Sequence, residues 1–247
     1  MKIAIVNYTG TVGKTTIAAH LLSPRMGNAP IFAVESINET AAGLGVDVEQ
    51  IKGDKFRELF RKLFSLDDAI IDVGASNIEA FLDGMVKFDE SHLEFDYFVI
   101  PLTSGTKEQK ETISMIGTLS DFGIPAEKIR LVFNRVDADV ADEFAHVVNY
   151  VKKEKNATAN TDAAIFESEL FDALGVKKLT VEALLKDATD YKALLKSNPE
   201  ASAKEKNAWG DMHGLKALSR SVNRNLDSVF STLFKYCLLY TSDAADE

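Results

Sequence analysis

Five short apolar runs, each followed by a longer segment, constrain the fold of this sequence more than any other feature. The runs are typical of strands that are buried on both faces of a sheet. Parallel strands need connections of a dozen or more residues, and the segments between the runs are long enough. The pattern therefore predicts an α/β fold, a doubly wound and mainly parallel sheet with helices on both faces. The runs cover residues 3–6, 30–34, 69–73, 97–102 and 129–133.

Segments between the runs carry a helical period. Residues 15–22 read as a helix that is predicted to stop before Pro24. Apolar residues recur at helical spacing over 56–64, with Phe64 on the apolar face, and again over 113–122. Ligands of such sheets bind beyond the carboxyl ends of the strands, so the polar residues there are the candidates for a site.

The loop after the first strand, Thr9-Gly-Thr-Val-Gly-Lys-Thr-Thr16, has the composition of a phosphate-binding loop. Glycines let backbone amides turn towards an anion, and the dipole of the following helix favours negative charge. We expect Lys14 to contact the β- and γ-phosphates of ATP and Thr15 to hold Mg²⁺. The other members are expected to cradle the phosphates: Gly10, Thr11, Val12, Gly13 and Thr16. A strict Walker A loop has glycine where this chain has Tyr8, and the alternative is an ordinary turn with a surface lysine.

Two further strands end in residues that suit the metal and the hydrolysis. Asp72 lies at the tip of the third strand, as in a Walker B strand, and is predicted to order the Mg²⁺ shell. Gly74 is expected to give its amide to the γ-phosphate. Glu35 ends the second strand and is the carboxylate predicted to orient an attacking water. Lys14, Asp72 and Glu35 are thus the candidate catalytic residues, although Asp72 also suits a turn, and Glu35 a cap or a salt bridge.

Asn134 and Arg135 follow the fifth strand. The asparagine is predicted to read the edge of the adenine, and the arginine to stack on or flank the base. Asparagine is also a common turn residue, so an ordinary turn is the alternative.

The C-terminal part differs in character. Residues 1–196 are the predicted ATPase domain, and 197–236 a helical extension that begins with a turn-rich stretch at 197–204. This extension is predicted to pack on the same domain, whereas contact with a membrane or with a partner is the less favoured interpretation. Its apolar stripe comprises Leu215, Leu218, Val222, Leu226, Val229, Leu233 and Phe234.

The end of the chain, Cys237–Glu247, is interpreted as an artefact, because it matches a translation of the mosaic-end adapter of transposase-based sequencing libraries. A genuine polar tail is the alternative. Without this segment the only cysteine is lost and the net charge changes from −10 to −7. A chain without cysteine suits a reducing cytoplasm, which is the expected location. Such modest acidity argues against a chain-wide basic surface, although a local patch leaves direct DNA binding open.

In combination, the loop, residues 70–74 and Asn134-Arg135 resemble the deviant Walker A ATPases of the ParA/MinD class, whose loop reads K-G-G-x-G-K-[ST]. The amino-acid sequence of four segments resembles the StbB family of plasmid stability proteins. These segments are residues 12–17, 33–38, 71–77 and 131–134. The resemblance implies a cytoplasmic ATP-binding switch that uses ATP and Mg²⁺ in plasmid stability, partition or positioning, linked to conjugation. It also implies a plasmid-encoded DNA-binding partner protein and a nucleotide-dependent homodimer.

Two departures from the class pattern bear on hydrolysis. Thr9 stands where the class has a lysine that reaches the phosphates of the other subunit. Ile37 stands where the class has a water-placing Asp. We therefore expect slow or partner-stimulated ATP turnover. Two other functions remain open, an ATP-dependent metabolic ligase that resembles dethiobiotin synthetase and a nucleotide-binding module without hydrolysis.

Overall fold

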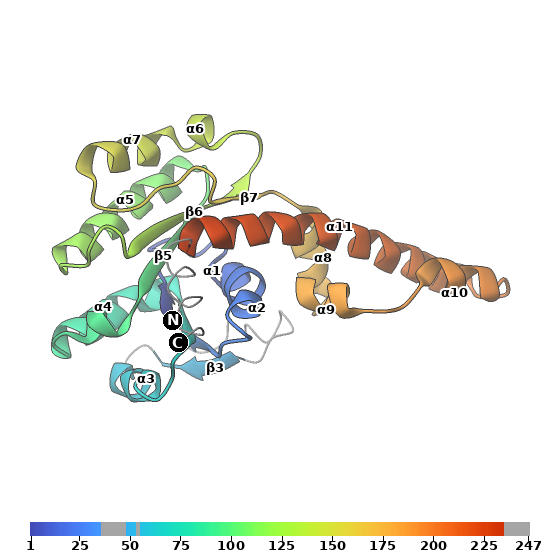
Figure 1. The fold of residues 1–247 in the computed structure, drawn as a ribbon, viewed down its shortest axis with the longest axis horizontal. Coiled ribbons are helices and arrows are strands. Elements are labelled where there is room, and N and C mark those ends of the chain that lie inside the picture. The colour runs from blue at the N-terminus through green and yellow to red at the C-terminus, as the bar shows by residue number, and fades with distance from the viewer. Residues whose placement is uncertain (36–47, 53–54, 235–247) are drawn as a thin grey trace, which may run out of the picture.

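A computed structural model describes residues 1–35, 48–52 and 55–234 of the chain. Its strands form one sheet in the order β3-β2-β4-β1-β5-β6-β7, and each neighbouring pair is parallel. The predicted fold class is therefore confirmed (Figure 1). The strands are β1 (Lys2–Ile5), β2 (Ile31–Val34), β3 (Val48–Ile51), β4 (Ala69–Val73), β5 (Tyr97–Leu102), β6 (Ile129–Val136) and β7 (Ala164–Phe166).

Helices cover both faces of this sheet because successive strand residues point to opposite sides. One face packs against α3 (Phe56–Leu63), α4 (Ile78–Lys87), α5 (Thr106–Asp121), α6 (Val140–Glu143) and α7 (Ala145–Glu154). The other packs against α1 (Lys14–Thr16), η1 (Ile17–Leu22), α2 (Ser23–Arg25), α8 (Glu169–Lys177), α9 (Val181–Lys186) and α11 (Ala203–Phe234). The short helix α10 (Tyr191–Ser197) precedes α11, and η3 (Ala75–Asn77) and η4 (Ser91–Glu94) are single 3₁₀ turns.

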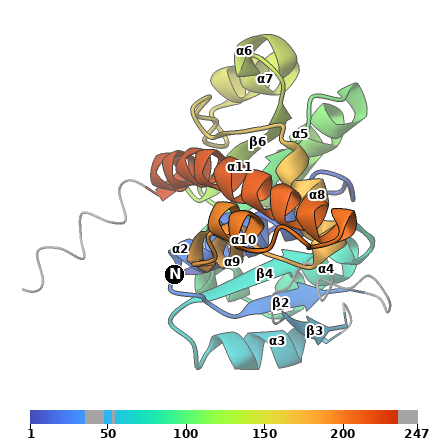
Figure 2. The same ribbon diagram turned by 90° about the vertical axis from the view of Figure 1, so that its right-hand side faces the viewer.

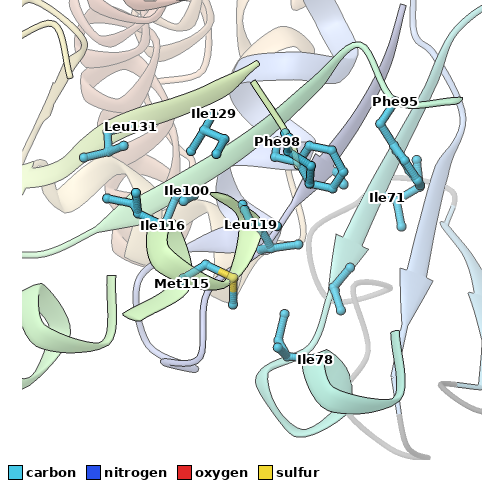
Figure 3. Close-up of a cluster of buried hydrophobic side chains, with 14 of the residues drawn as sticks. Ile71, Ile78, Phe95, Phe98, Ile100, Met115, Ile116, Leu119, Ile129 and Leu131 are labelled. Carbon is cyan, nitrogen blue, oxygen red and sulfur yellow. The ribbon is translucent and has the colours of Figure 1, made fainter. Parts of the chain in front are cut away.

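The core is continuous on each face of the sheet. Figure 3 shows part of the first face, where Phe98 and Ile100 of β5 meet Met115 and Leu119 of α5. These side chains are fully buried, as is expected for strands covered on both sides.

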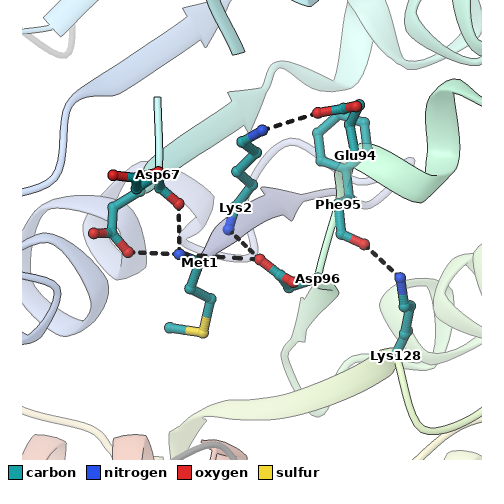
Figure 4. A network of polar contacts seen from close by, with 8 residues as sticks. Met1, Lys2, Asp67, Glu94, Phe95, Asp96 and Lys128 are labelled. Carbon is teal, nitrogen blue, oxygen red and sulfur yellow. Dashed lines mark hydrogen bonds and ion pairs between the residues drawn. The ribbon is translucent and has the colours of Figure 1, made fainter. Parts of the chain in front are cut away.

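Polar contacts link the strands at the amino edge of the sheet, where the parallel strands begin (Figure 4). The Lys2 backbone amide donates to Asp96, and its ammonium pairs with Glu94 at 2.8 Å. Lys128, just before β6, donates to the Phe95 carbonyl. Ion pairs and hydrogen bonds therefore stabilise the amino edge of the sheet. The predicted site residues lie at the other edge, where the strands end.

Two strands were not predicted. β3 has the sequence Val-Glu-Gln-Ile with two exposed polar residues, and β7 has only three residues, so neither shows a buried apolar run. Both lie at an edge of the sheet, where one side of the strand has no neighbouring strand.

The prediction that the first helix stops before Pro24 was wrong. The helical segment continues through η1, which has π geometry, into α2 and ends at Arg25. Proline has no N–H for the carbonyl four residues earlier, that of His20. The Arg25 guanidinium donates to that carbonyl at 2.9 Å and to the Leu21 carbonyl at 3.2 Å, which compensates for the missing bond.

The assignment of Phe64 to an apolar helix face was also wrong. The helix α3 ends at Leu63, and the Phe64 side chain is 80% exposed. Phe64 keeps helical backbone angles, but one residue step turns its side chain about 100° away from the buried Leu63, beyond the face of the helix that packs on the core.

The C-terminal helix is longer than the predicted apolar stripe. Its second half packs on the sheet and buries, among others, Val222, Leu226, Val229 and Phe234. Its first part, residues 203–214, has no buried residue and projects from the body together with α10 (Figure 1). Figure 2 views this projection from its end. Within the described part of the chain, no helix is both long and apolar enough to span a bilayer.

Candidate nucleotide-binding site

The predicted phosphate loop connects β1 to α1 at the carboxyl edge of the sheet. Gly13 has a φ of 85°, in the left-handed region that favours glycine. A Cβ at this position would also collide with the amide of Asn134. Val12 is fully buried, whereas Gly10 and Thr11 are exposed. The loop is therefore held in place by the buried Val12, while Gly10 and Thr11 are accessible to a phosphate group.

Lys14 is buried and points back along the loop. Its ammonium donates to the carbonyls of Thr9 at 2.6 Å and Asn7 at 3.3 Å. Burial lowers the pKa of Lys14 to about 8, against the carboxylates of Asp72 and Glu111, which raise it. A surface lysine, the alternative considered for the sequence, would not lie in this position, because the side chain is only 4% exposed.

Asp72 lies beside the loop at the end of β4. Burial raises the pKa of this carboxyl, while a hydrogen bond from the Thr15 side chain and the charge of Lys14 lower it. Its Oδ2 atom is buried and has no hydrogen-bond partner among the described residues. An unsatisfied buried carboxylate oxygen next to a threonine hydroxyl fits a Mg²⁺ ion, which prefers hard oxygen ligands and shares them with substrate phosphates.

Glu35 and Gly74 directly follow the neighbouring strands β2 and β4. A Cβ at Gly74 would lie 3.4 Å from the Cγ atom of Glu35, so the structure brings these two residues together. The Gly74 amide was predicted to face the γ-phosphate, but here it donates to the Val34 carbonyl at 3.0 Å. That bond continues the β2–β4 ladder by one residue, which the sequence did not indicate.

Asn134, at the carboxyl end of β6, is bonded to the phosphate loop. Its side-chain amide donates to the Val12 carbonyl at 2.9 Å, although the two residues are far apart in sequence. Arg135 is exposed and has a φ of 55°, unusual for a residue other than glycine. The structure thus places Asn134 and Arg135 next to Gly13 and Thr16, whereas their contact with an adenine base stays a prediction.

A cavity of about 540 Å³ opens beside this loop. Sequence analysis missed the part of its wall that comes from β7 and α8, because that segment has no motif. Ser168 precedes the apolar helix α8 and caps its start, so the local signal there marks a helix start and not a binding site. The lining residues are Gly13, Thr16, Asn134, Arg135, Phe166, Glu167, Ser168, Phe171, Asp172, Gly175 and Val176.

The surroundings of Thr9 were also not predicted from the sequence. Its hydroxyl donates to the carboxylate of Glu111 on α5, and its side chain is buried. The position of the class lysine is therefore turned towards α5 in this structure. The position of the class Asp, Ile37, lies outside the described residues.

The sheet order, the loop after β1 and the acidic residue ending β4 together define a P-loop NTPase fold. The sequence itself matches no protein-family model and no curated protein.

Solved structures of MinD show the same fold. The cell division ATPase MinD of Pyrococcus furiosus matches with a TM-score of 0.53 at 14% identity, over 92% of this chain and 98% of that one. MinD of Pyrococcus horikoshii, solved with Mg-ADP, gives 0.50 at 16% identity over 90% and 95%. The MinC:MinD complex of Aquifex aeolicus gives 0.52 at 14% identity over 72% and 86%. At such low identity the match shows the fold, which is that of the MinD-type P-loop ATPases.

Proposed function

We propose that this protein is an ATP-binding switch whose hydrolysis of ATP is slow or stimulated by a partner. The observation that supports this most is the burial of Lys14 in a loop between β1 and α1, in electrostatic range of Asp72. A buried lysine that is bonded only to loop carbonyls is positioned for an anionic ligand, since it has no direct carboxylate partner among the described residues.

The loop residues bind the phosphates in this proposal. Lys14 contacts the β- and γ-phosphates, and the amides from Gly10 to Thr16 surround them. Thr15 and Asp72 hold Mg²⁺, which when bound neutralises charge on the phosphate oxygens. Glu35 orients the attacking water.

The base occupies the cavity at Asn134. Because the side-chain amide nitrogen donates to Val12, the side-chain oxygen is left to accept a hydrogen bond from the base. The exocyclic amino group of adenine donates such a bond, whereas the corresponding oxygen of guanine would face it with a second acceptor. The site is thus expected to prefer ATP to GTP.

The biological setting follows from the resemblance to the StbB family and from the MinD fold. We propose a role in plasmid stability, partition or positioning, linked to conjugation, with a plasmid-encoded DNA-binding partner and a nucleotide-dependent homodimer. One matching structure is a complex of MinD with MinC, which supports partner binding through this fold. Residues 1–196 form the ATPase domain in this view, and 197–236 an extension packed on it.

Replacement of Lys14 by alanine tests the site. We expect Lys14→Ala to lose about 2 kcal/mol or more of ATP binding free energy, because a charge-assisted contact is removed. Calorimetry with ATP, ADP and GTP in the presence of Mg²⁺ measures this loss, and circular dichroism checks that the variant folds. A folded variant with unchanged ATP affinity would reject the assignment of the loop.

Phosphate-release kinetics test the slow turnover. Each missing catalytic contact costs about 3 kcal/mol, or roughly a hundredfold in rate. We expect slow release for the wild type, release that is still not fast for Thr9→Lys or Ile37→Asp alone because the other contact is missing, and the largest gain for the double variant. Wild-type turnover at about tens per second without a partner would contradict the proposal. The same assay with plasmid DNA or a candidate partner separates a switch from a metabolic ligase.

A further inference from the structure

The start of the phosphate loop is held by α5. The Asn7 side-chain amide donates to the Thr112 hydroxyl at 2.9 Å, and the Thr9 hydroxyl donates to the carboxylate of Glu111. The Thr9 backbone amide in turn donates to the Asn7 side-chain oxygen at 3.2 Å. The adjacent residues Glu111 and Thr112 of α5 therefore hold the start of the loop, and the Thr9 hydroxyl in turn holds the Glu111 carboxylate.

Glu111 lies close to the group that would bind phosphate. The Lys14 ammonium bonds the carbonyl of Thr9, the same residue whose hydroxyl bonds Glu111. The Glu111 charge also acts on Lys14, since it helps to raise the pKa of that lysine against the effect of burial.

The charge of Glu111 is only partly neutralised. Lys107, one turn earlier on α5, pairs with it at 3.6 Å, but the lysine side chain is 78% exposed. Exposed ion pairs of this kind are weak and are screened by solvent. The Glu111 side chain is only 30% exposed. Solvent therefore screens its charge less than it would screen a fully exposed carboxylate, and the charge acts on the adjacent loop.

We propose that Glu111 sets the preference of the site between ATP and ADP. This inference rests on the proposed nucleotide site and adds a specificity residue to it. The γ-phosphate brings additional negative charge to Lys14, and the Glu111 carboxylate repels that charge. ATP binding is therefore weakened more than ADP binding.

Two substitutions separate charge from loop geometry. Glu111→Gln removes the charge but keeps an oxygen that can accept the hydrogen bond of Thr9. Thr9→Val removes that hydrogen bond but keeps the charge of Glu111 and the backbone carbonyl that Lys14 uses. The exposed Asp121, at the far end of the same helix, provides the matched control Asp121→Asn.

The experiment is calorimetry on the full chain with Mg²⁺, ADP and a non-hydrolysable ATP analogue. We expect Glu111→Gln to raise the ratio Kd(ADP)/Kd(ATP analogue) by about tenfold at low salt, with a smaller gain at high salt because of screening. Thr9→Val should change both affinities by a similar factor, and Asp121→Asn should change neither.

An unchanged ratio in folded Glu111→Gln would overturn this inference while leaving the nucleotide site intact. A salt-independent gain, or an equal gain in Thr9→Val, would also overturn it, because the effect would then come from loop geometry. A wild type that binds neither nucleotide would reject the proposed function itself, and this inference with it.

Discussion

At the scale of a single residue, burial changes the acid–base behaviour of His20. It lies in η1 behind the phosphate loop, is 2% exposed and packs against Phe171, with 5.8 Å between ring centroids. Its Nδ1 atom has no hydrogen-bond partner among the described residues. Burial lowers the pKa of His20 to about 4, because a charged imidazolium would be poorly solvated there. No spacing or motif in the sequence distinguishes this histidine from the other three.

The depressed pKa predicts acid sensitivity. The unfolded chain takes up a proton near the ordinary pKa of 6.5, whereas the folded chain does so only near 4. Stability from this group is therefore present above pH 6.5 and is lost as pH falls towards 4. We expect about 2 kcal/mol less unfolding free energy at pH 5 than at pH 7 from His20.

Urea denaturation at both pH values measures this loss. His20→Phe should reduce the difference between the two pH values, whereas His146→Gln, at an exposed position, should leave it unchanged. The same pH dependence in wild type and in folded His20→Phe would show that other groups cause it.

At the scale of an element, α11 joins distant parts of the fold. Asn225 donates to the Ala164 carbonyl at 2.9 Å and accepts from the Phe166 amide, so a helix side chain covers the outer edge of β7. Asp227 pairs with Arg25 at 2.7 Å and links α11 to α2. These contacts and the buried stripe make the second half of α11 part of the domain core.

Leu226 tests this role of α11. It is 1% exposed and belongs to the core cluster shared with β1, η1 and α8. We expect Leu226→Ala to cost about 2–5 kcal/mol of unfolding free energy, because a buried cavity is created. Chemical denaturation gives the value, with Ser221→Ala on the exposed face as control. A loss below about 0.5 kcal/mol would mean that α11 is only loosely attached.

At the scale of the whole molecule, one prediction concerns the end of the chain. Cys237–Glu247 lies outside the described residues, so its interpretation as adapter sequence stays a prediction. Small polar residues bury little apolar surface. Deletion of this segment should therefore leave the melting temperature and ATP affinity unchanged, as differential scanning calorimetry and titration would show. A clear fall in melting temperature would indicate that the segment packs on the domain.

The sequence by itself determined the elements whose signal is local. A strand buried on both faces must be apolar along its length, so β1, β2, β4, β5 and β6 could be predicted, as could the loop that follows β1. Lys14, Asp72 and Asn134 could be selected for the same reason, since each lies near the carboxyl end of such a strand or in the loop after it.

Only the tertiary structure decided which distant groups meet that site. Glu111 reaches Thr9, and Phe166 and Val176 line the cavity, through packing of α5, β7 and α8 that no local period encodes. The edge strands β3 and β7 are short and partly exposed, so pairing with a neighbour, and not an apolar run, makes them strands. The Gly74 amide is likewise taken by Val34 because β2 lies beside β4. Local patterns fix elements, whereas contacts between residues far apart in the chain depend on how those elements pack.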